Sequence, residues 1–432
     1  MSPSDHDARI CRELLEKGRG PVKSPIDVLQ NRHKTHATDK TGGHMRATNV
    51  LRLGACGVAA IALASVPATA AMSSSPTSST TASSLEPSPD CYQSPYVTGP
   101  TAAQACGDIA VPLNSTRPLD DGGTEFDYVY NGHTISAAVP PDGFNPLTAT
   151  PSQVDRYGLA NALAAASSTS QPDKARLMRA VLSQWHSTSP GQYVYIVPQS
   201  SYVVPTPGVP TASGTIVGNK YWSGYVAQGH EYTYVDGEWT ETAGNAGTCQ
   251  NSARQATWVG IGGYGTPNLA QDGTVDRLTG AAHGQFWTEV LPDQGIVLWP
   301  EVATTGSTVV AEVQYLGHDA WTQNVYSTNG ASRSVNYQGN GYSGTSAEVI
   351  VERPPDVYAN GDIAWIYQLF NYGSESFTAP DVKYSGDSHT WSLNQMPNVR
   401  IDMVSTVSSN YITNVSGWYP DGSFHDAWTA CN

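Results

Sequence analysis

The chain has 432 residues, of which 14% are charged, and its formal net charge at neutral pH is −15. Residues 216–432 hold seven Lys and Arg against twenty-one Asp and Glu, which accounts for −14 of that charge. A surface so poor in bases repels nucleic acid and anionic membranes, so we expect neither as a partner. In acid the carboxylates lose their charge, so this composition suits a protein that works at low pH.

Residues 45–71 have the order of a secretory signal peptide. Arginines precede an apolar stretch at 53–66, and the segment ends in the small residues Ala68-Thr69-Ala70. The apolar stretch is too short to span a bilayer. We therefore expect a secreted, extracellular protein. We interpret residues 1–44 as a non-native N-terminal extension and residues 72–90 as a Ser/Thr/Pro-rich linker.

Secretion makes the cysteines candidates for disulfides. Outside the extension and the signal peptide there are four, Cys91, Cys106, Cys249 and Cys431, which allow three pairings. Proximity in the sequence favours Cys91–Cys106, which leaves Cys249–Cys431. The sequence alone establishes neither pair.

Residues 91–215 are predicted to be a small, mixed and partly helical pro-region. The pattern indicates a strand at 134–139 and helices at 152–167 and 173–185, with Thr150 followed by Pro151 as a helix start. The region ends in the Pro-rich stretch 203–215. We expect cleavage within 203–218 to release the downstream domain, and the pro-region is a candidate inhibitor of it.

Residues 216–432 are predicted to form an all-β catalytic domain. Short runs rich in Val, Ile, Thr, Tyr and Trp alternate with Gly/Asn/Asp/Ser turns, and no long helix is predicted. About 217 residues of this pattern imply one antiparallel sandwich or barrel. We expect a monomer.

Several familiar hydrolase chemistries lack their motifs here. The chain contains no HExxH zinc motif, no GxSxG nucleophile elbow and no pair of Asp-Thr/Ser-Gly triplets, and its histidines after residue 216 are isolated. We therefore expect no metal and no cofactor. Amide hydrolysis without them requires a base for water, a donor for the oxyanion and an acid for the leaving amine. One glutamate and one glutamine are sufficient for these roles.

A set of short blocks spans residues 222–352: WSGY (222–225), DGEW (236–239), WVGIGG (258–263), LAQDG (269–273), FWTE (286–289) and SAEVIVE (346–352). The last block alternates strictly, so Glu348 and Glu352 share one strand face while the opposite face is aliphatic. The order of the blocks resembles that of the glutamic peptidases (eqolisins).

The resemblance implies a fold and a site. The family fold is an antiparallel β-sandwich like the concanavalin jelly roll, and the implied activity is that of an endopeptidase acting on polypeptides in acid. The resemblance assigns Glu352 as general base and then acid, and Gln271 as the residue that orients water and stabilises the oxyanion, with no covalent intermediate. Residues implied at the substrate cleft are Trp258, Trp287, Glu289 and Asp276. One departure is Gly262, which stands where family members commonly have Asp.

Two other functions fit the same residues. A glycoside hydrolase on a jelly roll would use Glu289 and Glu352 as its carboxylate pair, which must be about 5–5.5 Å apart for retention or about 6.5–9.5 Å apart for inversion. A catalytically inactive homologue would use the same face to bind peptide or carbohydrate.

Overall fold

The computed structural model describes residues 109–197, 216–244, 248–249, 253–277, 283–339, 342–357 and 363–432. By its contacts the chain divides into residues 1–80 and residues 81–432, and every described residue belongs to the second unit. The predicted extension, signal peptide, linker and Cys91–Cys106 pair lie outside the described residues. So does the predicted cleavage stretch 203–218, apart from its last three residues.

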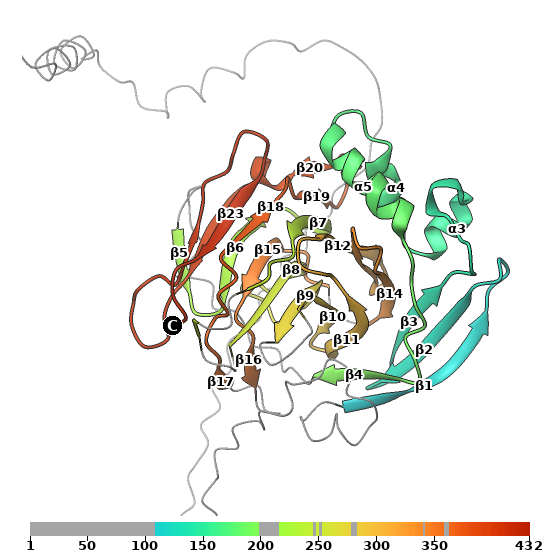
Figure 1. Cartoon of the computed structure of the whole chain (residues 1–432), viewed down its shortest axis with the longest axis horizontal. Helices are drawn as coiled ribbons and strands as arrows, with labels where there is room; N and C mark the ends of the chain where they lie inside the picture. Colours follow the sequence, from blue (N-terminus) through green and yellow to red (C-terminus); the bar gives the residue numbers. More distant parts are fainter. Residues whose placement is uncertain are drawn as a thin grey trace, which may run out of the picture. The chain divides into compact units, whose positions relative to one another are not determined.

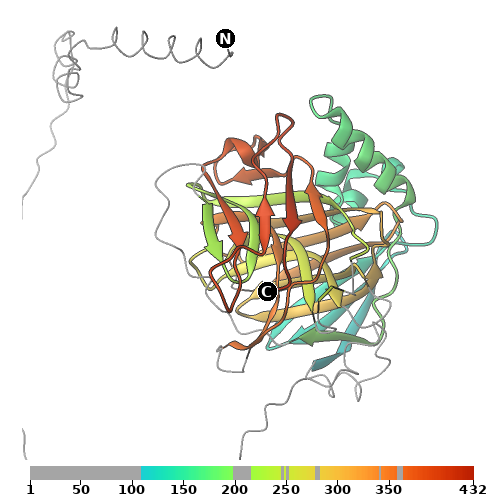
Figure 2. The same cartoon turned by 60° about the vertical axis from the view of Figure 1, so that its left-hand side comes forward.

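The described chain is mostly β-structure, and its largest sheet has 18 strands (Figures 1 and 2). This sheet consists of two series of paired strands, and strand β1 belongs to both. We call the two series ladder A and ladder B. Among the paired strands of the described residues, only β5 and β21 run parallel. The predicted β class is therefore confirmed.

Ladder A carries five of the six blocks found in the sequence, and the block DGEW lies on β7 (Tyr232–Thr240) of ladder B. In spatial order its strands are β1 (Ile109–Pro118), β4 (Tyr193–Val197), β11 (Gln294–Val302), β10 (Gln285–Leu291), β9 (Leu269–Arg277), β8 (Arg254–Gly262), β15 (Ser346–Glu352), β6 (Trp222–Gln228), β21 (Asn398–Met403) and β5 (Ile216–Asn219).

Ladder B runs from β1 through β2 (Thr124–Tyr130), β3 (His133–Val139), β14 (Ser332–Gln338), β13 (Ala320–Ser327), β12 (Thr308–Gly317), β7 (Tyr232–Thr240) and β19 (Asp381–Tyr384) to β20 (Trp391–Ser392). Two small sheets complete the β-structure. They are β16 (Pro355–Val357) with β17 (Ile363–Ile366), and β18 (Ser374–Phe377) with β23 (Phe424–Trp428) and β22 (Thr413–Val415).

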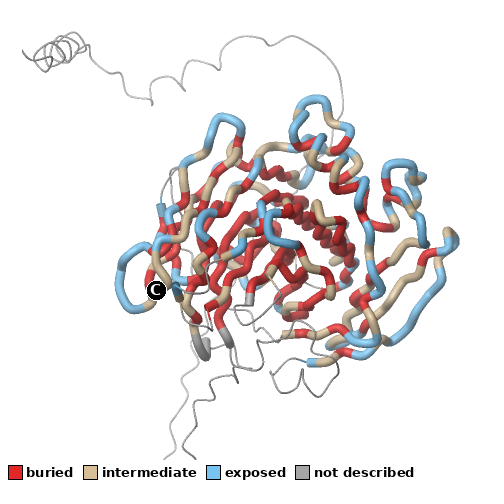
Figure 3. Tube along the Cα trace, viewed as in Figure 1, coloured by how far each residue is buried: buried red, intermediate tan, exposed pale blue. Residues whose placement is uncertain are grey.

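One apolar cluster joins the two ladders. Alternate residues of each strand point into it, for example Val349 and Val351 of β15 in ladder A and Val309 and Val313 of β12 in ladder B. Buried positions concentrate along the strands and exposed ones in the loops (Figure 3). The opposite face of ladder A carries a second apolar cluster, which includes Trp222, Trp258, Trp287 and Ile350.

In the described part of the chain all helices precede residue 200, apart from the single turn η4 (Leu393–Gln395). They are η3 (Pro146–Thr148), α3 (Pro151–Arg156), α4 (Ala160–Ala166) and α5 (Pro172–Gln184), grouped beside ladder B (Figure 1). The predicted start is confirmed, because Thr150 forms a capping box with Gln153. No helix in the described part of the chain is long and apolar enough to cross a membrane.

The single helix predicted at 152–167 is wrong, because the chain breaks it into α3 and α4. Gly158 adopts a φ of +68° between them. Its carbonyl accepts hydrogen bonds from Asn324 (3.0 Å) and Tyr326 (3.1 Å) of ladder B. These tertiary bonds replace the helical bonds that the local pattern would have continued.

Candidate active site

Five of the blocks seen in the sequence lie on neighbouring strands of ladder A, in the spatial order β10, β9, β8, β15 and β6. Strands β10, β9, β8 and β15 lie side by side, and residues opposite one another point to the same face. Glu289 lies opposite Gln271. Two residues further along the strands, Trp287, Gly273, Trp258 and Ile350 lie opposite one another. Two residues further again, Glu352 lies opposite Ala256.

Both residues of the predicted pair, Gln271 and Glu352, line one cavity on this face. Its lining comes from β6, β8, β9, β10 and β11, from the loop between β8 and β9, and from the end of β15 with the residues after it. The lining residues are Trp222, Ala256, Gly263, Thr266, Pro267, Leu269, Gln271, Val275, Trp287, Glu289, Leu291, Ile296, Glu352 and Pro354. The volume open to water is about 20 Å³. Since an ordered water needs roughly 10–15 Å³ by the same measure, the cavity has room for one.

The carboxylate of Glu352 is held by an indole. Trp258 Nε1 donates a hydrogen bond of 2.8 Å to Glu352 Oε2. Trp258 is fully buried and does not line the cavity, and its ring meets that of Trp222 edge to face at 5.0 Å. The structure thus places Trp258 behind the acid, and Trp222 lines the cavity in its place.

Gln271 and Glu289 form a direct contact on neighbouring strands. Gln271 Nε2 donates a hydrogen bond to Glu289 Oε2. Burial raises the pKa of Glu289 to about 8, the hydrogen bond from Gln271 opposes this, and the nearby charge of Glu352 adds to it. Glu289 is therefore a neutral carboxylic acid throughout the acid range.

A residue that the sequence did not indicate holds the backbone beneath this pair. Gln323 of β13 is fully buried, and its Nε2 donates to the carbonyl oxygens of Gln271 (2.6 Å) and Glu289 (3.0 Å). It reaches them across the apolar core from ladder B. This contact depends on how the two ladders pack against each other, so no local sequence pattern could have predicted it.

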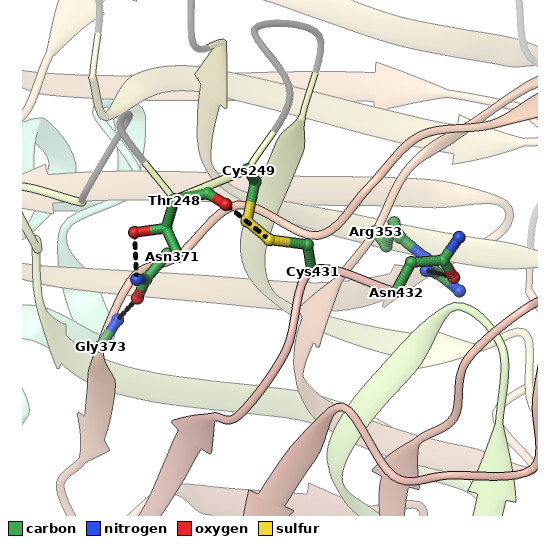
Figure 4. Close-up of a disulfide and its surroundings, with 7 residues drawn as sticks. All are labelled: Thr248, Cys249, Arg353, Asn371, Gly373, Cys431 and Asn432. Carbon is green, nitrogen blue, oxygen red and sulfur yellow. Dashed lines mark hydrogen bonds between the residues drawn. A yellow bond between two sulfur atoms is a disulfide. The ribbon is translucent and has the colours of Figure 1, made fainter.

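Arg353 is a second residue that the sequence analysis missed. It follows Glu352 directly, is fully buried, and donates to Asn432 Oδ1 (3.1 Å) and to the carbonyl of Lys220 (2.5 Å). Burial lowers the pKa of Arg353 to about 10. Figure 4 shows Arg353 and Asn432 beside the disulfide Cys249–Cys431, which confirms this predicted pair.

Asp276 is, after Trp258, the second predicted cleft residue that does not line the cavity. Asp276 lies on β9 an odd number of positions after Gln271, so its side chain points to the opposite face of the sheet. It accepts a hydrogen bond of 2.6 Å from the backbone N–H of Gly284. Its neighbours are Glu241 and Glu375, two buried carboxyls whose pKa values are raised, first by their burial and then by the charge of Asp276.

The departure at Gly262 has a structural explanation. Gly262 adopts a φ of +90°, and a Cβ added there would approach the carbonyl oxygen of Asn268 to 2.3 Å and Ser343 Oγ to 2.6 Å. Ser343 Oγ contacts Thr266 Oγ1 at 3.1 Å, and Thr266 Oγ1 also accepts a bond from the N–H of Gly263. Hydroxyl groups of the neighbouring loops therefore fill the space beside residue 262.

Among the described residues, no group of three or more His, Cys, Asp or Glu is arranged to hold a metal ion. No curated protein matches the chain. The model of the Peptidase A4 family matches residues 220–417. This part of the chain is a peptidase domain of the glutamic type. It contains all the cavity-lining residues.

The glutamic peptidase domain is similar to several solved structures. One is scytalido-glutamic peptidase with a peptide-based transition-state analogue, at 17% identity and a TM-score of 0.42, covering 49% of this chain and 98% of that one. Another is SCP-B of the eqolisin family with the tripeptide Ala-Ile-His, at 16% identity, a TM-score of 0.40 and the same coverage. A third is aspergilloglutamic peptidase from Aspergillus niger, at 18% identity and a TM-score of 0.32, covering 41% of this chain and 100% of that one.

Proposed function

We propose that the chain is a secreted endopeptidase that hydrolyses polypeptides in acid, with Glu352 as general base and then acid and Gln271 as the oxyanion donor. The observation that carries the proposal is the cavity that both side chains line, which has room for one water molecule. Secretion is supported by the signal-like segment 45–71 and by the disulfide Cys249–Cys431. The jelly-roll architecture and the limits of a catalytic domain at 216–432 belong to the same proposal.

The reaction begins with a water held between the two side chains. Glu352, fixed in direction by Trp258, takes a proton from this water as it attacks the scissile carbonyl carbon. Charge then develops on the carbonyl oxygen, and the second N–H of the Gln271 amide donates to it. Glu352 returns its proton to the leaving amine as the carbon–nitrogen bond breaks, so no covalent intermediate forms.

The two carboxyl groups of the cavity, Glu289 and Glu352, have different roles in this proposal. Because burial and the neighbouring charge of Glu352 raise the pKa of Glu289 to about 8, one proton resides on Glu289 in acid and Glu352 is left to act as the base. The bond from Gln271 to Glu289 fixes which end of the amide faces the cavity. A glycoside hydrolase is not favoured, since its acid and base would not need a glutamine tied to one of them.

The rest of the cavity wall is mainly apolar, so a substrate that lies over the cavity would meet an apolar surface there. Trp287 and Leu291 of β10 continue into Leu269, Val275 and Ile296 on the neighbouring strands. An apolar side chain next to the scissile bond would exclude water from this wall. Substrates with such a residue are therefore expected to be cleaved faster than those with a charged one.

Substitution of the two central residues tests the proposal. We expect Glu352→Gln and Gln271→Ala each to lower kcat for an acid-denatured protein substrate by at least about 100-fold, because each removes a role needed only in the transition state. Retention of the wild-type melting temperature would show that the fold is intact. Full activity in either purified variant would reject the assignment.

Glu348→Gln is the matched control for these variants. Glu348 lies on the same face of β15, is fully buried and does not line the cavity. Burial raises the pKa of Glu348 well above its usual value, so this carboxyl is neutral in acid and glutamine closely copies it. Glu348→Gln is expected to keep wild-type activity.

A further inference from the structure

Residues 109–197 lie outside the span that the peptidase family model matches, yet they share the core of the peptidase domain. Their contribution to the cluster between the ladders is Val111, Tyr128, Ile135, Ala137, Val194 and Ile196, each at most 3% exposed. The same cluster contains Trp299, Val335 and Tyr337 of the peptidase domain. Withdrawal of the N-terminal segment would expose apolar surface on both sides.

The segment also completes both ladders. In ladder A, β4 pairs with β11, so that Ile196 lies opposite Val297. In ladder B, β3 pairs with β14, so that Ala137 lies opposite Val335. Without these strands β11 and β14 would become open edges, and such edges present unpaired N–H and C=O groups to other chains.

A buried ion pair forms the third part of this contact. Lys174 of α5 places its Nζ 2.7 Å from Asp236, 2.8 Å from Asp381 and 4.0 Å from Glu238. Burial alone would lower the pKa of Lys174, but these carboxylates outweigh it and hold the pKa above its usual value. Removal of the lysine would leave buried carboxylates without their cation.

None of this contact covers the cavity. The lining residues all lie between positions 222 and 354, so residues 109–197 contribute none of them. The nearest approach along the ladder is Val197 of β4, which lies opposite Ile296, a residue of the cavity wall. The segment therefore supports that wall from the side and lines no part of the cavity.

We propose that residues 109–197 are a permanent structural partner of the peptidase domain, retained in the working enzyme, and not an inhibitor that must leave. The shared core and the two strand pairings are independent of pH, so the partner stays bound in acid even where the ion pairs of Lys174 weaken. Cleavage of the connection between the two parts would then give a two-chain enzyme held together by these contacts.

The test is to cut the full chain and ask whether the parts separate. A site for a sequence-specific protease is inserted within 203–210, the chain is cut, and the product is run on size-exclusion chromatography with mass analysis at pH 7 and pH 4. We expect both fragments in one peak at both pH values, with peptide hydrolysis within about twofold of the uncut protein. Glu352→Gln protein is cut in parallel, so that self-digestion does not affect the result.

Separation of the N-terminal fragment at either pH would overturn the proposal if the remaining domain kept its melting transition and its activity. Urea unfolding of the cut protein gives a second readout. A single transition for both fragments supports a permanent partner, whereas early loss of the N-terminal fragment, followed by a separate transition of the domain, contradicts it.

Lys174→Met and Arg176→Met form a matched pair on α5. The Arg176 side chain is 77% exposed and, among the described residues, forms its ion pair with Asp173 of its own helix, whereas the Lys174 side chain is 5% exposed and reaches the peptidase domain. We expect Lys174→Met to lower the urea midpoint of the cut protein and Arg176→Met to leave it unchanged. Equal midpoints for both variants would show that the Lys174 contact does not hold the parts together. Co-elution of the two fragments and the urea midpoint do not depend on which residues are catalytic.

Discussion

At the scale of single residues, the hydrogen bond from Trp258 to Glu352 sets the direction of the proposed base. A bond of 2.8 Å from an N–H to a carboxylate stabilises the charged form of the acid. Trp258→Phe removes this donor and keeps most of the ring. We expect the acid limb of the pH profile of kcat/KM to move to higher pH, with about a tenfold loss of activity at the low end.

Full activity of Trp258→Phe at every pH would contradict this role. Trp222→Phe is the comparison, because Trp222 lines the same cavity and its ring stacks edge to face on Trp258. It donates no bond to Glu352 among those described, so its replacement should change KM without moving the acid limb.

Glu289 allows a prediction about a neutral carboxylic acid. Because its pKa is raised to about 8 by burial, glutamine resembles its form in acid, and Glu289→Gln can still accept the bond from Gln271. We expect this variant to keep kcat at pH 4 within about tenfold of wild type. Glu289→Ala leaves the buried amide of Gln271 without a partner, at about 1–3 kcal/mol, and should lose a further factor of about 10 to 100. Steady-state kinetics of both variants at pH 4 checks the order.

The sequence analysis singled out the two residues that we propose as catalytic, but not the residues that support them. Gln271 and Glu352 stand in recognisable blocks, and they line one cavity. Gln323 and Arg353 were missed, because their importance depends on which strand lies across the core or which chain end lies nearby. Asp276 shows the same limit, since period-two alternation turns it away from the face of Gln271.

At the scale of elements, the turn after β8 depends on a backbone that side chains disfavour. Gly262→Ala combines a φ of +90° with an approach of 2.3 Å to the Asn268 carbonyl, so we expect a loss of more than about 2 kcal/mol in the free energy of unfolding. Gly306 has a φ of +83° and nothing within 4 Å of an added Cβ, so Gly306→Ala isolates the backbone effect at about 1 kcal/mol. Urea denaturation measures both, and equal losses would show that crowding at residue 262 is unimportant.

Local pattern identified elements more reliably than their partners. The alternation of SAEVIVE and the capping signal at Thr150 both predicted the right element, because each depends on neighbours in the sequence. The strand YVYIV at 193–197 pairs with residues about 100 positions away. Its register is decided by the shared core, so the sequence did not indicate that this stretch joins ladder A.

At the scale of the whole molecule, buried acids make stability depend on pH. Burial raises the pKa of Glu238, Glu289 and Glu312 to about 8 and that of Asp426 to about 7. A carboxyl whose pKa is higher in the folded than in the unfolded protein contributes its full stabilisation below the unfolded pKa, which is about 4. This stabilisation is lost as the pH rises toward the pKa of the folded state. We therefore expect the melting temperature to be highest near pH 4 and to fall steadily between pH 5 and pH 8.

Thermal unfolding followed by circular dichroism from pH 3 to pH 8 checks this direction. A melting temperature that rises toward neutral pH would contradict it. Glu348→Gln should flatten the curve, raising the melting temperature at pH 7.5 while leaving that at pH 4 unchanged, because only the ionised form of this fully buried carboxyl is unfavourable.

The disulfide Cys249–Cys431 has a practical consequence for anyone who handles this protein. It spans 182 positions, so a peptidase molecule nicked by a sister copy anywhere in that interval keeps both pieces covalently linked. On a non-reducing gel such a sample would run as one intact band, and only thiol treatment would separate the pieces. Storage damage by self-digestion should therefore be judged on reduced samples.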